Sequence, residues 1–304
     1  MPIASKVLMI RPIHFGYNAE TAVNNAFQVN KTDERTQEKA LYEFDNFVHK
    51  LKEKGIEVLV VNDTPSPATP DSIFPNNWIS LHSNGTICLY PMYAKNRRAE
   101  RKPFVLSKIK SEFDIQKIED FTGYEEQEMY LEGTGSMVLD SDHRIAFACI
   151  SERTNAKVLE DFCVKMNYQP FTFHSYDQKG APIYHTNVMM CVGDLFVVAC
   201  IDSITDEEEK NMFIKLVQGL NKELITITYE QMNEFAGNMI QLQNKKGDKY
   251  LIMSQSAYKS LTDEQINELS RYNELLPIPL TTIETNGGGS ARCMIAEVFT
   301  AQKS

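Results

Sequence analysis

The sequence predicts an α/β fold, a propeller of five ββαβ units arranged around one axis. Strand-like hairpins recur roughly every 50 to 60 residues. Each hairpin is followed by a helical stretch and then by one more short strand. A strand-like run also stands at each end of the chain, in residues 5–12 and 292–299, and pairing of these two runs would close a ring. Five units fill the length, so we expect residues 1–304 to form a single domain.

Tight-turn residues between apolar runs mark four hairpins. Asn84-Gly85 in the first hairpin and Gly193-Asp194 in the third favour the two-residue turns that join antiparallel strands. The hairpins are predicted in residues 76–92, 135–150, 187–201 and 237–256. The third strands of the units are expected in residues 56–61, 113–118, 168–173, 224–229 and 276–283.

Helical spacing of apolar residues connects the hairpins to these third strands. Residues 154–166 and 212–220 carry apolar side chains at intervals of three and four, as expected for helices with one buried face. Thr205 with Glu208, and Thr262 with Gln265, resemble capping boxes that begin two further helices.

Composition limits the class of protein and of partner. The chain has 304 residues, 42% of them hydrophobic, and a formal net charge of −10. This charge disfavours nucleic acid, which is bound mainly through lysine and arginine, and a small molecule is the better partner. Arg11 and Pro12 interrupt the apolar stretch near the N-terminus, so we expect neither a signal peptide nor a membrane span, and a cytoplasmic location. The sequence leaves a homo-oligomer open.

Six cysteines occur without any CxxC pair, and most lie in apolar patterns. Reduced structural thiols are typical of such positions. We therefore expect no disulfide and no zinc site.

Polar residues stand at the starts of the hairpins. Four of the starts are unusually polar for buried strands and read FPNNW, YLEGTG, YHTN and SARC. Repeats around an axis bring corresponding positions together at the centre, however far apart they are in the sequence. We therefore expect the chemistry of the protein at the axis. The five starts fall near Asn77, Gly135, Asn187, Asn238 and Arg292.

A thiol, an imidazole and a carboxylate occur among these residues, as Cys293, His185 and Glu132. They are the parts of an activated cysteine nucleophile, because a base or cation favours the thiolate and a carboxylate orients the imidazole. Each taken alone also fits a structural role, as a small core residue, a hydrogen-bonded histidine and a turn residue. Their corresponding positions in a repeat favour a shared site.

Together the motifs resemble those of the guanidine-modifying superfamily, which has the pentein fold and includes arginine deiminases, dimethylarginine hydrolases and amidinotransferases. LEGTG, YHTN and GGGSARCM match the family's motifs in order, and the resemblance spans essentially the whole chain. It implies that Cys293 is the nucleophile, His185 the general acid and base, and Glu132 the carboxylate of the site. No metal or organic cofactor is expected.

The resemblance also points to arginines that bind the α-carboxylate of an amino-acid substrate. ISERTN is similar to the family's S-x-R-T segment and implies Arg153. KNRRAER resembles a basic segment with the same task, for which Arg98 or Arg97 is the candidate. The planar fork of arginine suits a carboxylate. A solvated helix face is the alternative interpretation of this basic segment.

Two positions depart from the deiminase pattern, because Asn77 and Asn187 stand where aspartates usually grip a guanidinium. A guanidinium has only donors and needs anionic acceptors, whereas a neutral ureido group offers a carbonyl and N–H groups that amides can match. With Asn76, these residues are expected to bind a urea-type substrate. FPNNW and HTN in this setting look like the citrulline hydrolase (ureidase) branch of the family.

The expected function is therefore hydrolysis of citrulline to ornithine, carbon dioxide and ammonia through an S-carbamoyl-cysteine intermediate. An arginine deiminase or dimethylarginine hydrolase that tolerates the asparagines is the alternative. An amidinotransferase and a non-catalytic binding member of the same fold remain as further alternatives.

Overall fold

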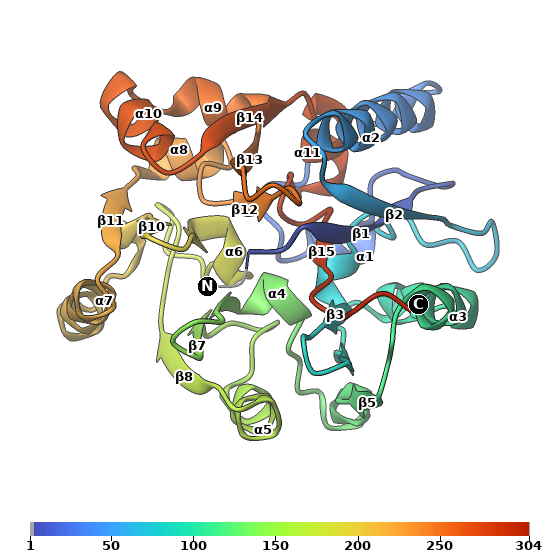
Figure 1. The fold of residues 1–304 in the computed structure, drawn as a ribbon, viewed down its shortest axis with the longest axis horizontal. Helices are drawn as coiled ribbons and strands as arrows, with labels where there is room; N and C mark the ends of the chain where they lie inside the picture. Colours follow the sequence, from blue (N-terminus) through green and yellow to red (C-terminus); the bar gives the residue numbers. More distant parts are fainter. Residues whose placement is uncertain (1–2, 304) are drawn as a thin grey trace.

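The computed structural model describes residues 3–303 and confirms the predicted α/β propeller. The strands form five three-stranded sheets placed around a common axis (Figure 1). In each sheet the middle strand pairs antiparallel with the inner strand and parallel with the outer one. This is the order expected of a ββαβ unit.

The five sheets, each given as inner, middle and outer strand, have the following bounds. They are β15 (Ala296–Glu297), β1 (Lys6–Arg11) and β2 (Glu57–Asn62); β3 (Ile79–Leu81), β4 (Thr86–Leu89) and β5 (Lys117–Asp120); β6 (Val138–Asp140), β7 (Ile145–Cys149) and β8 (Gln169–Phe173); β9 (Met190–Val192), β10 (Phe196–Ala199) and β11 (Glu223–Thr226); and β12 (Ile240–Gln243), β13 (Lys249–Ser254) and β14 (Glu274–Ile278).

Helices connect the middle strands to the outer strands and surround the ring. The longer ones, α2, α3, α5, α7 and α10, lie at the periphery in Figure 1. The helices are α1 (Ala19–Ala22), α2 (Thr36–Glu53), α3 (Pro103–Glu112), α4 (Gly133–Ser136), α5 (Ala156–Met166), α6 (Thr186–Met189), α7 (Glu207–Gly219), α8 (Tyr229–Asn233), α9 (Gln255–Ser260), α10 (Asp263–Ser270) and α11 (Thr281–Gly287), with 3-10 turns η1 (Pro75–Asn77), η2 (Lys95–Glu100), η3 (Thr122–Gln127) and η4 (Ile201–Ser203).

The two ends of the chain close the ring, as the sequence predicted. β1 pairs antiparallel with β15, with Val7 opposite Glu297 and Leu8 opposite Ala296. On its other edge β1 pairs parallel with β2. One sheet therefore joins strands from the first and last parts of the sequence.

Four local predictions need correction. The strands predicted in residues 113–118 and 224–229 are β5, Lys117–Asp120, and β11, Glu223–Thr226, because pairing with the middle strands is confined to those residues. The strand predicted in residues 276–283 is β14, Glu274–Ile278. It ends at Ile278 because its last pairing partner in β13 is Ser254. Helix α7 is capped by Asp206, whose carboxylate accepts two backbone N–H groups, so the box predicted at Thr205 is wrong. The box at Thr262 is confirmed.

Short helical turns precede the inner strands, and the polar residues of the hairpin starts lie in or beside them. Asn77 ends η1, Glu132 precedes α4, and His185 precedes α6. These turns aim their side chains toward the axis, whereas the extended starts expected from the sequence would have alternated between two faces. None of the helices within residues 3–303 has the length and apolar character needed to cross a membrane.

Aromatic packing between neighbouring units holds the ring together. Phe213 of α7 is fully buried, and its ring centroid lies 5.8 Å from that of Phe147 and 5.6 Å from that of Phe173 in the preceding unit. Both pairs are edge-on, the arrangement that aromatic quadrupoles favour.

Replacing Phe213 by alanine should lower the free energy of unfolding by about 3 to 5 kcal/mol, because it leaves a cavity between two units. Urea denaturation followed by circular dichroism measures the change. Val164→Ala on the exposed face of α5, where the side chain is 82% exposed, is the control and should change it by less than about 0.5 kcal/mol. Equal effects of the two variants would contradict this account of the core.

Candidate active site

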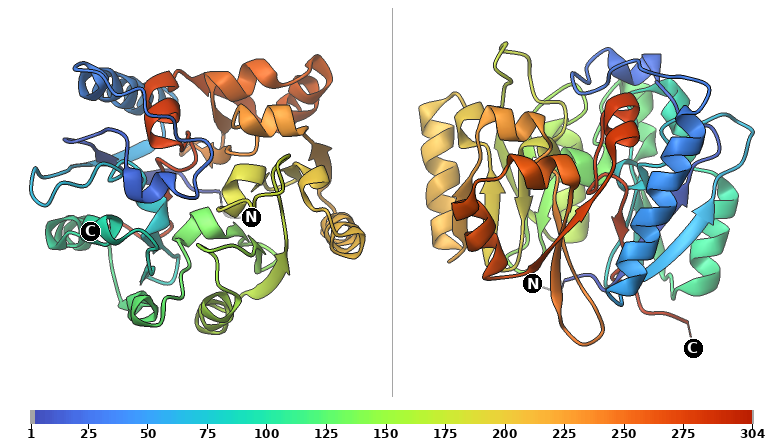
Figure 2. Two further views of the ribbon diagram at one scale, coloured as in Figure 1. Left: turned by 180° about the vertical axis from the view of Figure 1, so that it is seen from behind. Right: turned by 90° about the horizontal axis from the view of Figure 1, so that it is seen from above.

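A cavity opens at one end of the axis, and four of the eight predicted site residues line it: Cys293, His185, Asn77 and Arg153. Figure 2 (right) shows α1 and α11 at this end of the molecule and both chain termini toward the other. Segments from all over the sequence line the cavity, which explains why no single motif defines it. Its lining residues are Thr21, Asn25, Asp71, Phe74, Asn77, Arg97, Arg153, Tyr184, His185, Gly287, Gly288, Gly289 and Cys293.

The glycine-rich loop carries Cys293 into this cavity. Helix α11 ends at Gly287 and is capped by Gly288, whose φ of 64° is rarely adopted by residues with a side chain. A Cβ there would also lie 2.6 Å from Nδ2 of Asn25, in the segment that covers the loop. The backbone N–H of Cys293 then donates to the carbonyl of Ser290 at 3.0 Å and fixes the turn.

Two side-chain amides donate hydrogen bonds to the thiol. Nδ2 of Asn187 lies 3.4 Å from Sγ of Cys293, and Nδ2 of Asn238 lies 3.2 Å from it. Between residues 3 and 303, no hydrogen bond joins the thiol to His185 directly. The imidazole and the thiol line the same cavity. A bound substrate or water would connect them.

His185 is held by a buried carboxylate. Its Nε2 lies 2.7 Å from Oε2 of Glu132, and the backbone N–H of Tyr93 donates to Oε1 of Glu132 at 2.9 Å. An ionised carboxylate only accepts, so the proton of the neutral imidazole sits on Nε2 and the lone pair on Nδ1. Nδ1 is thereby available to accept a proton.

Electrostatics favour the charged glutamate and the neutral histidine. Burial by itself raises the pKa of Glu132, but Arg153, His185 and Arg97 outweigh burial and lower the pKa to about 2. Burial lowers the pKa of His185 to about 4, although the hydrogen bond to Glu132 opposes it. At neutral pH the pair is an ionised carboxylate and a neutral imidazole, the state that a general base requires.

Arg153, the predicted carboxylate-binding arginine, lies in the cavity wall. Its guanidinium is 3.5 Å from Glu132, stacks 4.8 Å from the ring of Tyr184, and donates to the carbonyl of Thr21 at 2.8 Å. It also contacts Oδ1 of Asn24. Arg153 therefore ties the segment around α1 to the site.

Of the two candidates in the basic segment, the cavity contains Arg97 and not Arg98. Arg97 is buried, pairs with Glu100 at 2.8 Å, and donates to Oδ1 of Asn77 at 2.7 Å. Arg98 points away, toward the carbonyl of Met92 and the carboxylate of Glu125. In the 3-10 turn η2 successive side chains diverge by about a third of a turn, so only one of two adjacent arginines can face the axis.

The three predicted asparagines are buried but occupy different places. Asn77 lines the cavity, and its Nδ2 donates to Oδ1 of Asn76 at 3.1 Å. Asn76 is not among the lining residues, and its Nδ2 has no partner within the described chain. Asn187 contacts the thiol through Nδ2, while its Oδ1 has no hydrogen-bond partner there.

Sequence reasoning missed Asp71 and gave Asn238 no role. Asp71 is 2% exposed, accepts from Asn18 at 2.7 Å through Oδ2, and keeps Oδ1 without a hydrogen-bond partner among residues 3–303. Burial raises its pKa, although Arg97 opposes the shift. Asp71 precedes the first hairpin and carried no signal, whereas the place of Asn238 at a hairpin start could have revealed it.

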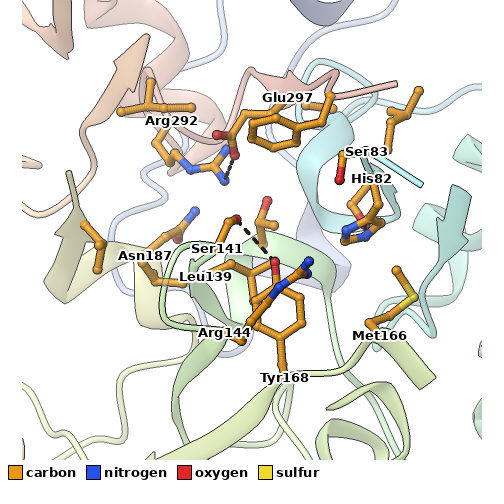
Figure 3. A pocket seen from close by; sticks show the side chains of 18 of the residues that line it. His82, Ser83, Leu139, Ser141, Arg144, Met166, Tyr168, Asn187, Arg292 and Glu297 are labelled. Carbon is orange, nitrogen blue, oxygen red and sulfur yellow. Dashed lines mark hydrogen bonds and ion pairs between the residues drawn. The ribbon is translucent and has the colours of Figure 1, made fainter. Parts of the chain in front are cut away.

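A second cavity, of about 230 Å³, has a different set of lining residues (Figure 3). Asn187 lines it, and so does Arg292, whose guanidinium pairs with Glu297 at 3.0 Å. Asn187 therefore separates this cavity from Cys293. Within the described chain, no group of three His, Cys, Asp or Glu side chains could hold a metal ion.

The cysteines divide into one that lines the cavity and five that lie elsewhere in the core. All six are free and buried. Burial raises the pKa of five of them to about 11 or 12; these are Cys88, Cys149, Cys163, Cys191 and Cys200.

A family model described as N,N dimethylarginine dimethylhydrolase, eukaryotic, matches residues 11–300. No curated protein sequence gives a significant match. Solved structures resemble the chain at low identity. They include the apo structure of ArgZ, an arginine dihydrolase from the ornithine–ammonia cycle in cyanobacteria, with 18% identity, a TM-score of 0.77 and coverage of 97% of this chain and 41% of that one.

Two further solved structures match this chain over most or all of their own length. The N-terminal domain of ArgZ, covalently bound to a reaction intermediate, has 18% identity, a TM-score of 0.76 and coverage of 96% of this chain and 97% of that one. A dimethylarginine dimethylaminohydrolase variant, as an adduct with S-methyl-L-thiocitrulline, has 15% identity, a TM-score of 0.66 and coverage of 97% and 100%. The chain thus spans about two fifths of intact ArgZ, and these likenesses support the fold.

Gly135→Ala should abolish most activity without unfolding the protein. A Cβ at Gly135 would lie 2.4 Å from Nδ2 of Asn77 and 2.8 Å from Nδ1 of His185. Both side chains must move, and a displacement of this size costs about 100-fold in turnover. Steady-state kinetics measures the loss, and circular dichroism checks the fold. Gly219→Ala, where a Cβ meets nothing within 4 Å, is the control. Unchanged kinetics in Gly135→Ala would refute the close packing.

Stability should fall in acid because of the buried Glu132–His185 pair. Both groups have folded-state pKa values below their ordinary values, so the unfolded chain takes up protons first as the pH falls. Their stabilising contribution is complete above about pH 6.5, and the part from His185 is lost toward pH 4. Thermal unfolding across this range should show a smaller pH dependence in His185→Gln than in wild type. His49→Gln, on the exposed side of α2, should keep the wild-type dependence.

Proposed function

The chain belongs to the eukaryotic N,N dimethylarginine dimethylhydrolase family, and within it we propose, from the hydrogen bonds of the cavity, a cysteine hydrolase of a ureido amino acid, most simply citrulline. Hydrolysis of a non-peptide C–N bond follows from membership of this family. The choice of a ureido over a guanidino substrate rests on one feature of the cavity, the orientation of Asn77.

Asn77 directs its acceptor toward Arg97 and keeps a donor for the substrate. Its Oδ1 already accepts from the buried guanidinium of Arg97 at 2.7 Å, which fixes the amide so that Nδ2 is the remaining group. One hydrogen of Nδ2 is used by Asn76. A guanidinium has no atom that accepts the other, whereas the oxygen of a ureido group does. The orientation of the Asn77 amide is the observation on which the proposal rests.

Bond formation begins at Cys293. Its thiolate attacks the ureido carbon, and the C–N bond to the ornithine nitrogen breaks. His185, protonated at Nδ1 by the proton that left the thiol, gives this proton to the departing nitrogen. Ornithine leaves, and an S-carbamoyl-cysteine remains. The N–H of Asn77 stabilises charge that develops on the oxygen during the attack.

Hydrolysis then restores the enzyme. His185 takes a proton from a water molecule, which attacks the S-carbamoyl carbon, and the C–S bond breaks to return the thiolate. The carbamate that leaves decays to carbon dioxide and ammonia. Glu132 stays ionised throughout and keeps the imidazole oriented through Nε2.

The amino-acid end of the substrate has complementary groups in the same cavity. Arg153 would bind the α-carboxylate, after releasing part of its contact with Asn24. The unpartnered Oδ1 of Asp71 would accept from the α-ammonium group, which has three donors. Both residues line the cavity with Cys293.

A guanidino amino acid such as arginine or methylarginine is the second candidate. The family model supports it, as do the substrates named for the solved relatives. One observation in the site also favours it: three buried carboxyl groups, Asp71, Glu100 and Glu132, face two guanidinium groups, Arg97 and Arg153. An extra positive charge on the substrate would offset this excess.

Purified protein incubated with citrulline, arginine and dimethylarginine separates the two candidates. Ornithine and ammonia formed from citrulline, with Cys293→Ala inactive, is the expected result. Citrulline formed from arginine or dimethylarginine, with no ornithine from citrulline, would replace the proposal with the second candidate. Turnover of all three substrates would indicate a site that carries out both hydrolyses.

Asn77→Asp should shift the preference toward guanidino substrates. The aspartate would keep one oxygen on Arg97 and turn the second, an acceptor, toward the substrate. We expect kcat/KM for citrulline to fall by about 100-fold, the size of losing one oxyanion donor, while binding of arginine improves. Competition kinetics with both substrates measures the ratio. An unchanged ratio would show that Asn77 does not select the substrate.

A further inference from the structure

We propose that Asn238 is a catalytic residue whose side-chain amide stabilises negative charge on the sulfur of Cys293. This inference rests on the proposed role of Cys293 as nucleophile but not on which substrate it attacks. Neither the hairpin pattern nor the family motifs quoted above assign a task to Asn238. The hydrogen bonds of Asn238 assign it one.

Three hydrogen bonds hold the Asn238 amide beside the sulfur. Nδ2 donates to the backbone carbonyl of Asn187 at 2.9 Å and to Sγ of Cys293 at 3.2 Å. Oδ1 accepts the backbone N–H of Arg292 at 3.1 Å. The side chain is 1% exposed, so water does not compete for these bonds.

The two backbone contacts fix which end of the amide faces the sulfur. Rotating the amide by half a turn would place Oδ1 against the carbonyl oxygen of Asn187 and Nδ2 against the N–H of Arg292, which are two repulsive contacts. The donor therefore faces Cys293. A donor stabilises a thiolate more than a thiol, because hydrogen bonds to a charged acceptor are stronger.

The nearest cation in the sequence does not serve this purpose. The guanidinium of Arg292, adjacent to Cys293, donates to the carbonyl of Ile295 at 2.9 Å and pairs with Glu297 (Figure 3). The two hydrogen bonds that the sulfur accepts come from the neutral amides of Asn187 and Asn238. Two amide donors, of which Asn238 is also fixed by backbone contacts, therefore face the sulfur in place of this guanidinium.

A neutral substrate makes this arrangement useful. A guanidinium brings its own positive charge beside the sulfur and favours the thiolate when it binds, whereas a ureido group brings none. Stabilisation of the thiolate must then come from the protein. A carboxylate at position 187 or 238 would instead repel the thiolate.

The experiment measures alkylation of the thiol by iodoacetamide as a function of pH, in the full chain and without substrate. The buried thiols with pKa values of about 11 or 12 stay protonated below pH 9, so only Cys293 should react, and Cys293→Ala identifies its signal. The variants leave in place the charged and titratable groups around the sulfur. In the cavity these are Asp71, Arg97, Arg153, Tyr184 and His185. Glu132 lies behind His185, and Arg292 is adjacent to Cys293 in the sequence.

Asn238→Asp keeps the shape and the contact with Arg292 but turns an anionic oxygen toward the sulfur. We expect alkylation at pH 7 to slow at least about tenfold and its pH profile to move up by at least about one unit. Asn238→Ser, with a shorter hydroxyl donor, should lie between wild type and Asn238→Ala. Asn221→Asp, an exposed left-handed turn residue, has the same charge change and should match wild type.

Each outcome has a distinct meaning. Profiles of Asn238→Asp, Asn238→Ala and wild type that coincide would overturn the inference, even if citrulline is turned over. If Asn238→Asp does not fold, as judged by near-ultraviolet circular dichroism, the order of wild type, serine and alanine variants decides the matter. Turnover of no substrate, with Cys293 unreactive in wild type, would instead overturn the proposed function.

Discussion

Pairing between the first and last strands of the chain is the constraint on which the site depends. β15 is only two residues long and is held in the ring by its antiparallel pairing with β1. Cys293 precedes β15 by three residues, so the position of the thiol at the axis follows from that pairing. The same sheet includes β2, which leads toward the segment of Asp71 and Asn77. Closure of the ring therefore places groups from both ends of the sequence in one cavity.

The pairing of buried charges around the cavity is the second feature. Arg97 and Arg153 offset the burial of Glu132 and let this carboxylate stay ionised, while burial keeps His185 neutral. The arginines also have structural partners, since Arg97 positions Asn77 and Arg153 holds the segment around α1. Removing either one would leave a buried carboxylate uncompensated, which costs more than the pair contributes when intact. Recognition and stability are thus coupled in the same side chains.

Amides rather than carboxylates surround the reacting sulfur. Asn187 and Asn238 donate to Cys293, and Asn77 keeps only its donor free because Arg97 occupies its oxygen. Asparagine can donate or accept, so its residue type does not decide its role. The fixed partners on its far side decide it. The hydrogen-bond network around an asparagine, and not its residue type, therefore indicates which substrate group it can bind.

Sequence patterns by themselves determined the repeat, the closing strands and the polar hairpin starts, because hydrophobic period and turn chemistry are local properties. They also singled out Cys293, His185 and Glu132, because these residues stand at corresponding positions of the repeat. Only the tertiary structure decided that Arg97 rather than Arg98 faces the axis, that Asp71 joins the cavity, and that Asn238 contacts the sulfur. Those facts depend on side-chain direction in short turns and on contacts between units, and neither is encoded in the spacing of residues along one unit.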